Sequence, residues 1–150
     1  ACKHLWLGGG RFLTSGGLGT MGYALPAAVG VKVADSSRQA MVICGDGSFQ
    51  MSMNELAAVR TRNLDLKILL LDNGVLGLVR QIQNTPPYHG SFGVSLEGSP
   101  DYAAIAAAYG IPSIRADREA QVEDALDRFL NQPGSCLLIV RVDPDVTTND

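Results

Sequence analysis

The 150-residue sequence predicts an α/β fold in which a parallel sheet carries helices on both faces. Short apolar runs alternate with segments of helical periodicity, which is the order found in α/β proteins. The apolar runs lack polar alternation, as expected of strands that are buried on both faces of a parallel sheet. No repeat or linker divides the chain, and its length suits a single domain.

Local signals predict the elements in chain order. We expect strands, each an apolar run bounded by turn residues, at 38–44 (RQAMVIC), 67–71 (KILLL), 111–116 and 136–142 (CLLIVRV). We expect helices at 25–33, 52–62, 76–83, 101–109 and 118–131. Pro26 stands in the first turn of the first helix, and Ser52 and Glu55 have capping-box spacing at the start of the second. Residues 84–98 contain Pro86 and Pro87, and we predict a long surface loop there.

Composition and charge argue against several classes of protein. Hydrophobic residues make up 46% and charged residues 18% of the chain, which excludes intrinsic disorder. The formal net charge of −3 argues against nucleic-acid binding, and no apolar run is long enough to cross a membrane. The apolar stretch at 1–10 is too short for a secretory signal. Three distant cysteines, Cys2, Cys44 and Cys136, indicate a reducing compartment, so we expect a cytoplasmic protein.

Glycine is the unusual component, because 17 residues cluster at 8–10, 16–22 and 45–47. The segment Gly17-Leu18-Gly19-Thr20-Met21-Gly22 matches the G-x-G-x-x-G pattern of dinucleotide-binding folds. A candidate strand at 11–14 precedes it, and Asp35 stands near the distance at which such folds place a ribose ligand. Asp35 follows a helix, however, instead of ending a second strand. A non-catalytic NAD-binding module is therefore the alternative hypothesis for this segment.

The third glycine cluster indicates a metal–diphosphate site. Gly45-Asp46-Gly47-Ser48 follows one buried strand, and Asn73 follows the next strand. A strand–helix–strand unit takes roughly 30 residues, so we expect Asp46 and Asn73 side by side at the carboxyl edge of the sheet. Carboxylate and amide oxygens suit Mg²⁺, and the glycines let backbone N–H groups approach phosphate. The alternative is that both segments are ordinary turns.

These residues resemble the cofactor signature of thiamine-diphosphate-dependent enzymes, in which G-D-G-S is followed by an asparagine. More narrowly, LTSGGLGTMGYALPAAVG at 13–30 and ICGDGSFQMSMNELAAVRTRNLDLKILLLDNGVLGLVRQ at 43–81 are similar to the acetolactate synthase (acetohydroxyacid synthase) large subunit. The similar region of that family is its C-terminal domain, which binds the diphosphate. His4 and Trp6 resemble the residues at which the family enters this domain.

The resemblance implies a role for each matching position. The implied Mg²⁺ ligands are Asp46, Asn73 and the backbone carbonyl of Val75. Positions at the diphosphate are Gly45, Gly47 and Ser48. The Gly19 carbonyl and the Met21 N–H would hold the aminopyrimidine ring, and the Met21 side chain would bend the cofactor. Residues that match the substrate pocket are Leu78, Val79 and Ile82.

The resemblance also implies an activity. Such an enzyme decarboxylates pyruvate and adds the resulting enamine to a second 2-oxo acid, giving acetolactate for branched-chain amino acid biosynthesis. Many biosynthetic members carry tryptophan where Ile82 stands, so a preference for 2-ketobutyrate as acceptor is in doubt. A pyruvate oxidase, a sulfoacetaldehyde acetyltransferase or a 2-oxo acid decarboxylase is the alternative within the same family.

This chain would be one domain of a larger three-domain enzyme. The family's activating glutamate comes from the pyrimidine-binding domain of a partner subunit, and neither Glu55 nor Glu97 matches it. We therefore expect the isolated chain to be inactive and the complete enzyme to be a homodimer or tetramer. The resemblance also allows a small regulatory subunit. It places FAD, where the family uses it, on a middle domain outside this chain.

Overall fold

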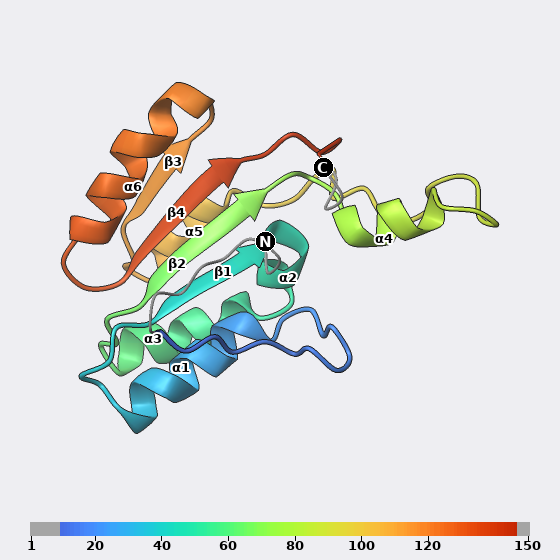
Figure 1. The fold of residues 1–150 in the computed structure, drawn as a ribbon. Coiled ribbons are helices and arrows are strands. Elements are labelled where there is room, and N and C mark those ends of the chain that lie inside the picture. The colour runs from blue at the N-terminus through green and yellow to red at the C-terminus, as the bar shows by residue number, and fades with distance from the viewer. Residues whose placement is uncertain (1–9, 147–150) are drawn as a thin grey trace.

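The computed structural model describes residues 10–146 and contains one four-stranded sheet with helices on both faces (Figure 1). Its strands are β1 (Met41–Gly45), β2 (Lys67–Asp72), β3 (Ser113–Ala116) and β4 (Cys136–Arg141). They lie in the order β1-β2-β4-β3, and every pair is parallel. The α/β prediction is confirmed, including the parallel sheet. All four strands therefore end at the same edge, where ligands bind in open parallel sheets.

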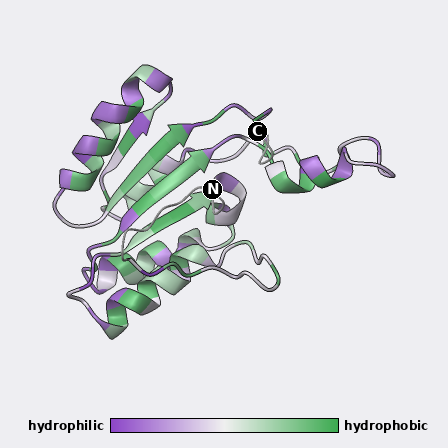
Figure 2. Cartoon of the chain, in the orientation of Figure 1, coloured by the Kyte–Doolittle hydropathy of each residue, from purple (hydrophilic) through white to green (hydrophobic). Residues whose placement is uncertain are grey.

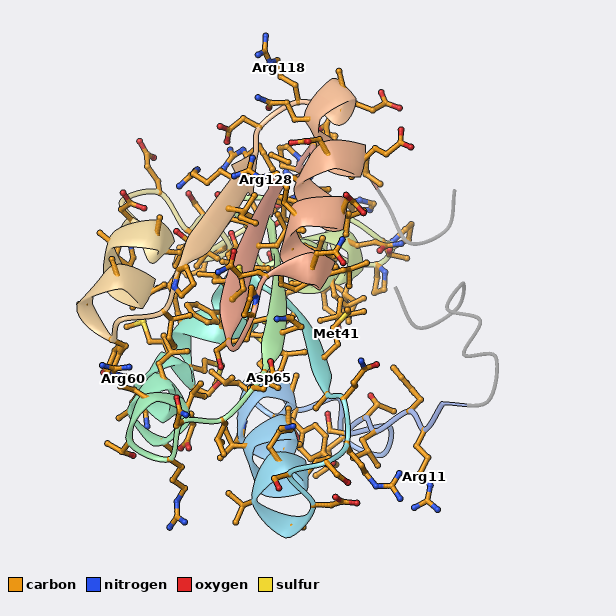
Figure 3. The ribbon with its side chains drawn as sticks, turned by 90° about the vertical axis from the view of Figure 1, so that its left-hand side faces the viewer. Arg11, Met41, Arg60, Asp65, Arg118 and Arg128 are labelled. Atoms are coloured by element: carbon orange, nitrogen blue, oxygen red, sulfur yellow. The ribbon has the colours of Figure 1, made fainter. Side chains whose placement is uncertain are left out.

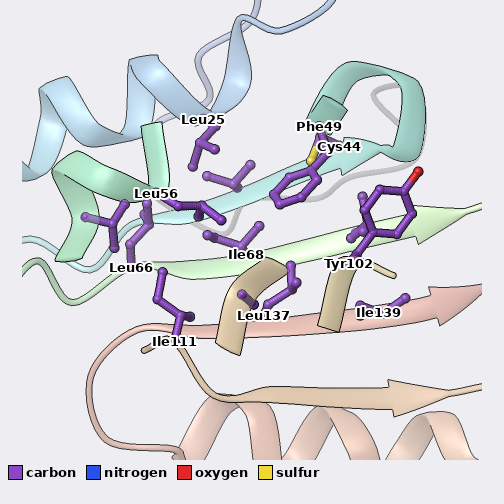
Figure 4. Packing of buried hydrophobic residues seen from close by; sticks show 14 of the residues in the cluster. Leu25, Cys44, Phe49, Leu56, Leu66, Ile68, Tyr102, Ile111, Leu137 and Ile139 are labelled. Carbon is purple, nitrogen blue, oxygen red and sulfur yellow. The ribbon is translucent and has the colours of Figure 1, made fainter. Parts of the chain in front are cut away.

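Three helices cover one face of the sheet and bury the larger part of the core. They are α1 (Ala24–Ala34), α3 (Leu56–Thr61) and α5 (Tyr102–Ala108). Leu25 of α1 and Leu56 of α3 pack over the strands, and Tyr102 of α5 meets Phe49 edge to face with ring centroids 5.7 Å apart (Figure 4). Alternate residues of each strand, such as Ile68, point into this cluster.

A single helix, α6 (Val122–Asn131), covers the opposite face beside β3 and β4. Phe129 is fully buried there against a smaller cluster that includes Leu138. The outer side of α6 is hydrophilic, whereas the central strands β2 and β4 are mostly hydrophobic, as Figure 2 shows. Charged side chains such as Arg118 extend outward from the layers (Figure 3). The first four residues of β4 are buried on both faces, which explains their unbroken apolar run, whereas β3 alternates buried Ile114 and Ala116 with two exposed residues.

The structure corrects the expected elements before the first strand. Residues 11–14 do not form a strand; they are exposed and irregular. The strand expected at 38–44 begins only at Met41, because Asp35 first turns the chain. Its carboxylate accepts hydrogen bonds from the Ser37 N–H at 3.1 Å and from the Arg38 Nε at 3.0 Å. These short-range contacts keep residues 35–38 out of the sheet.

The capping box predicted at Ser52 and Glu55 is wrong. Ser52 makes no side-chain cap; its hydroxyl is buried and donates to the Ser48 carbonyl at 3.5 Å. The reason is a helix that sequence analysis missed, α2 (Asp46–Gln50), which begins at once after β1. The expected helix 52–62 is accordingly divided into the short 3₁₀ turn η1 (Met53–Glu55) and α3.

The remaining elements agree with expectation apart from their ends. Asp101 caps α5 by accepting from the Ala103 N–H at 2.9 Å. The strand expected at 111–116 begins at Ser113, and the helix expected at 118–131 is the 3₁₀ turn η2 (Glu119–Gln121) followed by α6. Between β2 and α5, the helix α4 (Gly77–Gln83) and the irregular segment 84–98 project from the body of the molecule (Figure 1).

Candidate functional site

The site is organised around a buried carboxylate where β1 ends. Asp46 is the first residue of α2 and only 2% exposed. Its Oδ1 accepts from the Gly47 N–H at 2.9 Å, and its Oδ2 accepts from the Gly74 N–H at 2.7 Å. The second bond connects the end of β1 to the segment that follows β2. In the pairing of these two strands, Gly45 lies opposite Leu71. Asp46 therefore joins the two strand ends.

Asn73 stands directly beside this bond. Its Oδ1 accepts from the Val75 N–H at 3.1 Å, which forms a tight turn after β2. A Cβ at Gly77 would lie 3.0 Å from the Asn73 Nδ2, so glycine there lets the start of α4 approach the amide closely. The structure thus brings the segments of Asp46 and Asn73 together at the carboxyl edge, as the strand spacing predicted.

Electrostatics at this edge favour a bound cation. Burial raises the pKa of the Asp46 carboxyl, and nearby Asp72 raises it further, whereas the N–H groups of Gly74 and Gly47 lower it. Asp72 is itself buried and pairs with the Arg141 guanidinium at 3.3 Å. The negative charge of Asp46 is therefore only partly compensated by the chain. A hard divalent cation beside one carboxylate and one amide oxygen would supply the missing compensation.

The two glycine motifs of the sequence lie together in space. The Gly22 N–H donates to the Ser48 hydroxyl at 2.9 Å, which fastens the glycine-rich segment to α2. A Cβ built on Gly47 would lie 3.1 Å from the Met21 Cε and 2.5 Å from a Leu76 methyl carbon. A side chain at position 47 would have to displace these side-chain ends, whereas glycine leaves the backbone open to close approach. Gly19, with a φ of +61°, turns the segment 17–22 toward this edge.

Asp35 lies far from the glycine-rich segment. It follows the last turn of the 11-residue α1, roughly 16 Å along the helix from its start. Its carboxylate is already bonded to Ser37 and Arg38. The dinucleotide hypothesis required a strand at 11–14 and an acid near the glycines, and the structure has neither arrangement.

The expected substrate-pocket residues lie on the projecting helix α4. Leu78 is 64% exposed, Ile82 is 55% exposed, and Val79 is also exposed. No residue of α4 is buried. The structure gathers these three side chains on one short helix next to Asn73, but it does not enclose them in a pocket within residues 10–146.

A cavity of about 620 Å³ opens beside the site, and sequence analysis did not predict it. It lies where β2, β3 and β4 end, with Asn73, Gly74 and Val75 on one wall and the segment 95–101 on another. Three arginines also line it, and each pairs with a carboxylate: Arg80 with Asp145, Arg115 with Asp101, and Arg141 with Asp72. These partners are distant in sequence, so no local pattern could have revealed the cavity.

The structure also bears on expectations about residues and features outside this edge of the sheet. His4 and Trp6 lie outside the described residues. Burial raises the pKa of the Cys44 thiol to about 12, and Asp46 adds to this, so Cys44 is an unreactive core residue. Within 10–146, no group of three His, Cys, Asp or Glu side chains is arranged to hold a metal. Over the same range, none of the helices combines the length and apolarity needed to cross a membrane.

Comparison with known proteins identifies related sequences. The family model described as "Thiamine pyrophosphate enzyme, C-terminal TPP binding domain" matches residues 1–140. The chain is 47% identical over 133 residues to the acetolactate synthase isozyme 2 large subunit of Escherichia coli, covering 89% of this chain and 24% of that protein. It is 40% identical over 137 residues to the chloroplastic acetolactate synthase of Arabidopsis thaliana, covering 87% of this chain and 20% of that protein. The chain therefore spans about a quarter of the length of these relatives.

Proposed function

This chain belongs to the family of C-terminal TPP-binding domains of thiamine pyrophosphate enzymes, and from that premise we propose that it serves an acetolactate-synthase-like carboligase. The complete enzyme would decarboxylate pyruvate and join the two-carbon unit to a second 2-oxo acid. The observation that carries the proposal is the buried Asp46, hydrogen-bonded to Gly74 at 2.7 Å and placed beside Asn73. The similarity to acetolactate synthases supports the choice of reaction.

We assign the cofactor contacts to the residues at the carboxyl edge. Asp46, Asn73 and the Val75 carbonyl would hold Mg²⁺, which completes its shell with phosphate oxygens and water. The backbone at Gly45 and Gly47 and the Ser48 hydroxyl would meet the diphosphate, and Gly47 leaves room for that approach. When bound, thiamine diphosphate supplies the carbanion chemistry that amino acid side chains lack.

The remaining roles concern orientation and selection. The Gly19 carbonyl and Met21 N–H would orient the aminopyrimidine, and the Met21 side chain, which already lies next to Gly47, would set the bend of the cofactor. Leu78, Val79 and Ile82 would face the substrate once the site is assembled. Their exposure supports this, because apolar side chains exposed on a projecting helix mark a surface that contacts something else.

The rest of the catalytic machinery would come from other domains. The chain spans about a quarter of its relatives' length, and we propose that a glutamate from the pyrimidine-binding domain of a partner subunit activates the cofactor. On this proposal, the complete enzyme is a cytoplasmic homodimer or tetramer, and the isolated chain turns over no pyruvate. A regulatory subunit, or FAD on a middle domain, would act outside this chain.

Titration calorimetry with thiamine diphosphate and Mg²⁺ tests the site. We expect Asp46→Asn in the complete enzyme to weaken cofactor affinity at least about 100-fold, because it removes the one charged ligand. Asp124→Asn is the matched control, since Asp124 is exposed on α6. Unchanged cofactor affinity in Asp46→Asn would overturn the assignment.

Product analysis of the complete enzyme tests the reaction. With pyruvate as the only substrate, we expect acetolactate. Acetaldehyde would indicate a decarboxylase, and an oxidised two-carbon product would indicate an oxidase. No product at all would indicate a sulfoacetaldehyde-type acetyltransferase, because its own substrate is absent from this assay. Each of these three outcomes would overturn the carboligase proposal while leaving the cofactor site intact.

A further inference from the structure

The position of the projecting helix α4 is not fixed by buried side chains, so it depends on other contacts. None of its residues is buried, and it extends away from the sheet (Figure 1). Its base is held by backbone pairing, in which the Leu76 N–H donates to the Val94 carbonyl at 2.8 Å and the Leu96 N–H donates to the Gly74 carbonyl at 2.9 Å. These bonds anchor the start of the helix and leave its rotation and tilt to other contacts.

Arg80 makes a contact of this kind. Its side chain is only 23% exposed, whereas the apolar side chains of the same helix are exposed. Its guanidinium donates to the Pro144 carbonyl and, at 2.9 Å, to the Asp145 Oδ1. Both acceptors follow β4, so Arg80 links the middle of α4 to the segment beyond the neighbouring strand.

The acceptor segment is itself held in place. The Val142 N–H donates to the Asp72 carbonyl at 2.9 Å, which continues the pairing of β4 with β2. The Asp145 N–H then donates to the Asp143 Oδ1 at 2.8 Å, which closes a turn. Arg80 is therefore fastened to an extension of the sheet and not to a free end.

Helix geometry connects this contact to the exposed apolar side chains. Leu78 and Ile82 are four residues apart and share one face of α4. Arg80 is two residues from each, so at about 100° per residue it lies on the opposite face. A contact that fixes the direction of Arg80 also fixes the direction in which Leu78 and Ile82 point.

We propose that Arg80 is a positioning residue that sets the orientation of α4 and, through it, the choice of the acceptor 2-oxo acid by Leu78, Val79 and Ile82. This inference rests on the proposed function, because it takes those three side chains to face the substrate. Arg80 itself touches no reacting atom. It acts by keeping Leu78, Val79 and Ile82 in a fixed orientation relative to the carboxyl edge of the sheet.

The two hydrogen bonds of Arg80 do not contribute equally. The Asp145 carboxylate is 85% exposed, and exposed ion pairs contribute little to stability. The Pro144 carbonyl belongs to the backbone and cannot swing away without moving the chain after β4. Arg80→Ala removes both contacts, whereas Asp145→Asn removes only the charge, so the first variant is expected to have the larger effect.

Hydrogen exchange on this chain tests the contact without any appeal to activity. We expect Arg80→Ala to speed exchange of the α4 amides roughly tenfold or more, the loss expected for a charge-assisted hydrogen bond. Asp145→Asn should change it less than threefold, about the scale of an exposed ion pair. Arg62→Ala, at an exposed arginine after α3, is the control. Equal exchange of α4 in wild type and Arg80→Ala would overturn the proposal.

The acceptor competition of the complete enzyme tests the consequence. With pyruvate and 2-oxobutyrate offered together, we expect Arg80→Ala to shift the product ratio about tenfold, on the scale at which pockets discriminate one methylene group. Cofactor affinity should not change, because Asp46 and Asn73 lie outside α4, and Arg80→Lys should restore part of the ratio.

The outcomes separate the two proposals. If cofactor affinity falls together with activity while the product ratio stays constant, Arg80 is merely structural and the inference fails. If the wild-type complete enzyme makes no acetolactate at all, the proposed function fails, whatever the exchange experiment shows. An altered ratio with unchanged cofactor affinity supports both.

Discussion

The hydrogen bond between Ser48 and Gly22 joins the two glycine motifs, and Ser48→Ala removes it. The Ser48 Oγ accepts from the Gly22 N–H at 2.9 Å across 26 residues of sequence. Alanine keeps the helical backbone of α2 and deletes only the acceptor. The glycine-rich segment 17–22 then loses a link to the helix that begins with Asp46, so the variant isolates this one contact.

The expected magnitude follows from the geometry and burial of the bond. A backbone N–H paired with a neutral hydroxyl contributes about 0.5–1.5 kcal/mol, and Gly22 is only half-buried, so water can replace part of the loss. We expect a destabilisation of about 1 kcal/mol. For a chain of 150 residues this lowers Tm by about 2–4 °C.

Thermal unfolding and hydrogen exchange of residues 17–22 measure the effect. The matched control is Ser36→Ala, because the Ser36 hydroxyl is exposed and makes no hydrogen bond with the rest of residues 10–146. We expect the exchange of the Gly22 amide to accelerate in Ser48→Ala alone. If Gly22 exchanges at the wild-type rate in that variant, Ser48 does not hold the glycine segment, and the reasoning is refuted.

Three further predictions follow from burial and charge. Because burial raises the pKa of Asp46, the metal-free chain should become less stable as the pH rises above the ordinary value of 3.8, where only the folded state holds the proton, and Asp46→Asn should reduce this dependence of Tm on pH. An unchanged pH dependence in Asp46→Asn would contradict this. With a thiol pKa of about 12, Cys44 should react with iodoacetamide at pH 7.5 roughly 10³-fold more slowly in folded than in unfolded chain, as followed by mass spectrometry; equal rates would show that the thiol is accessible. Phe129→Ala should lower the free energy of unfolding in urea by about 3–5 kcal/mol, because Phe129 is fully buried. The control Leu130→Ala should lower it by less than about 0.5 kcal/mol, because Leu130 is 55% exposed. Similar losses in the two variants would refute the burial argument.

The sequence predicted that Asp46 and Asn73 lie at the same edge of the sheet, because strand periodicity and parallel topology determine where neighbouring strands end. Asp46 and Asn73 each follow a buried apolar run, and a parallel pair of neighbouring strands must end at one edge. No side-chain detail was needed for that inference. The same reasoning predicted the four strands and the helices on both faces.

Local patterns failed where a contact from outside the pattern decided the structure. Ser52 and Glu55 have capping-box spacing, but α2 already continues the chain from Asp46, and the Ser52 hydroxyl turns back to the Ser48 carbonyl. Residues 11–14 look like a strand in sequence but remain exposed and irregular. Neither outcome could be read from a window of a few residues, because each depends on what lies beside the segment.

Long-range polar contacts were equally invisible in the sequence. The Gly22 N–H meets Ser48, and Arg80 meets Pro144 and Asp145 across more than 60 residues. Polar residues such as these are common at exposed positions, so composition and spacing do not single them out. Only the fold, by bringing strand ends together, shows that they connect the projecting helix to the segment after β4 and the glycine segment to α2.

Asp46 is a group that selection for stability alone would not retain. Asp46 is 2% exposed, and its raised pKa means that its charged form is disfavoured in the folded chain. A buried carboxylate without full compensation weakens a fold, and residues of this kind concentrate at functional sites. The hydrogen bonds from Gly47 and Gly74 aim its oxygens but do not neutralise it. A cation beside Asn73 would neutralise it, and ligand binding would then be coupled to folding stability at the same residue.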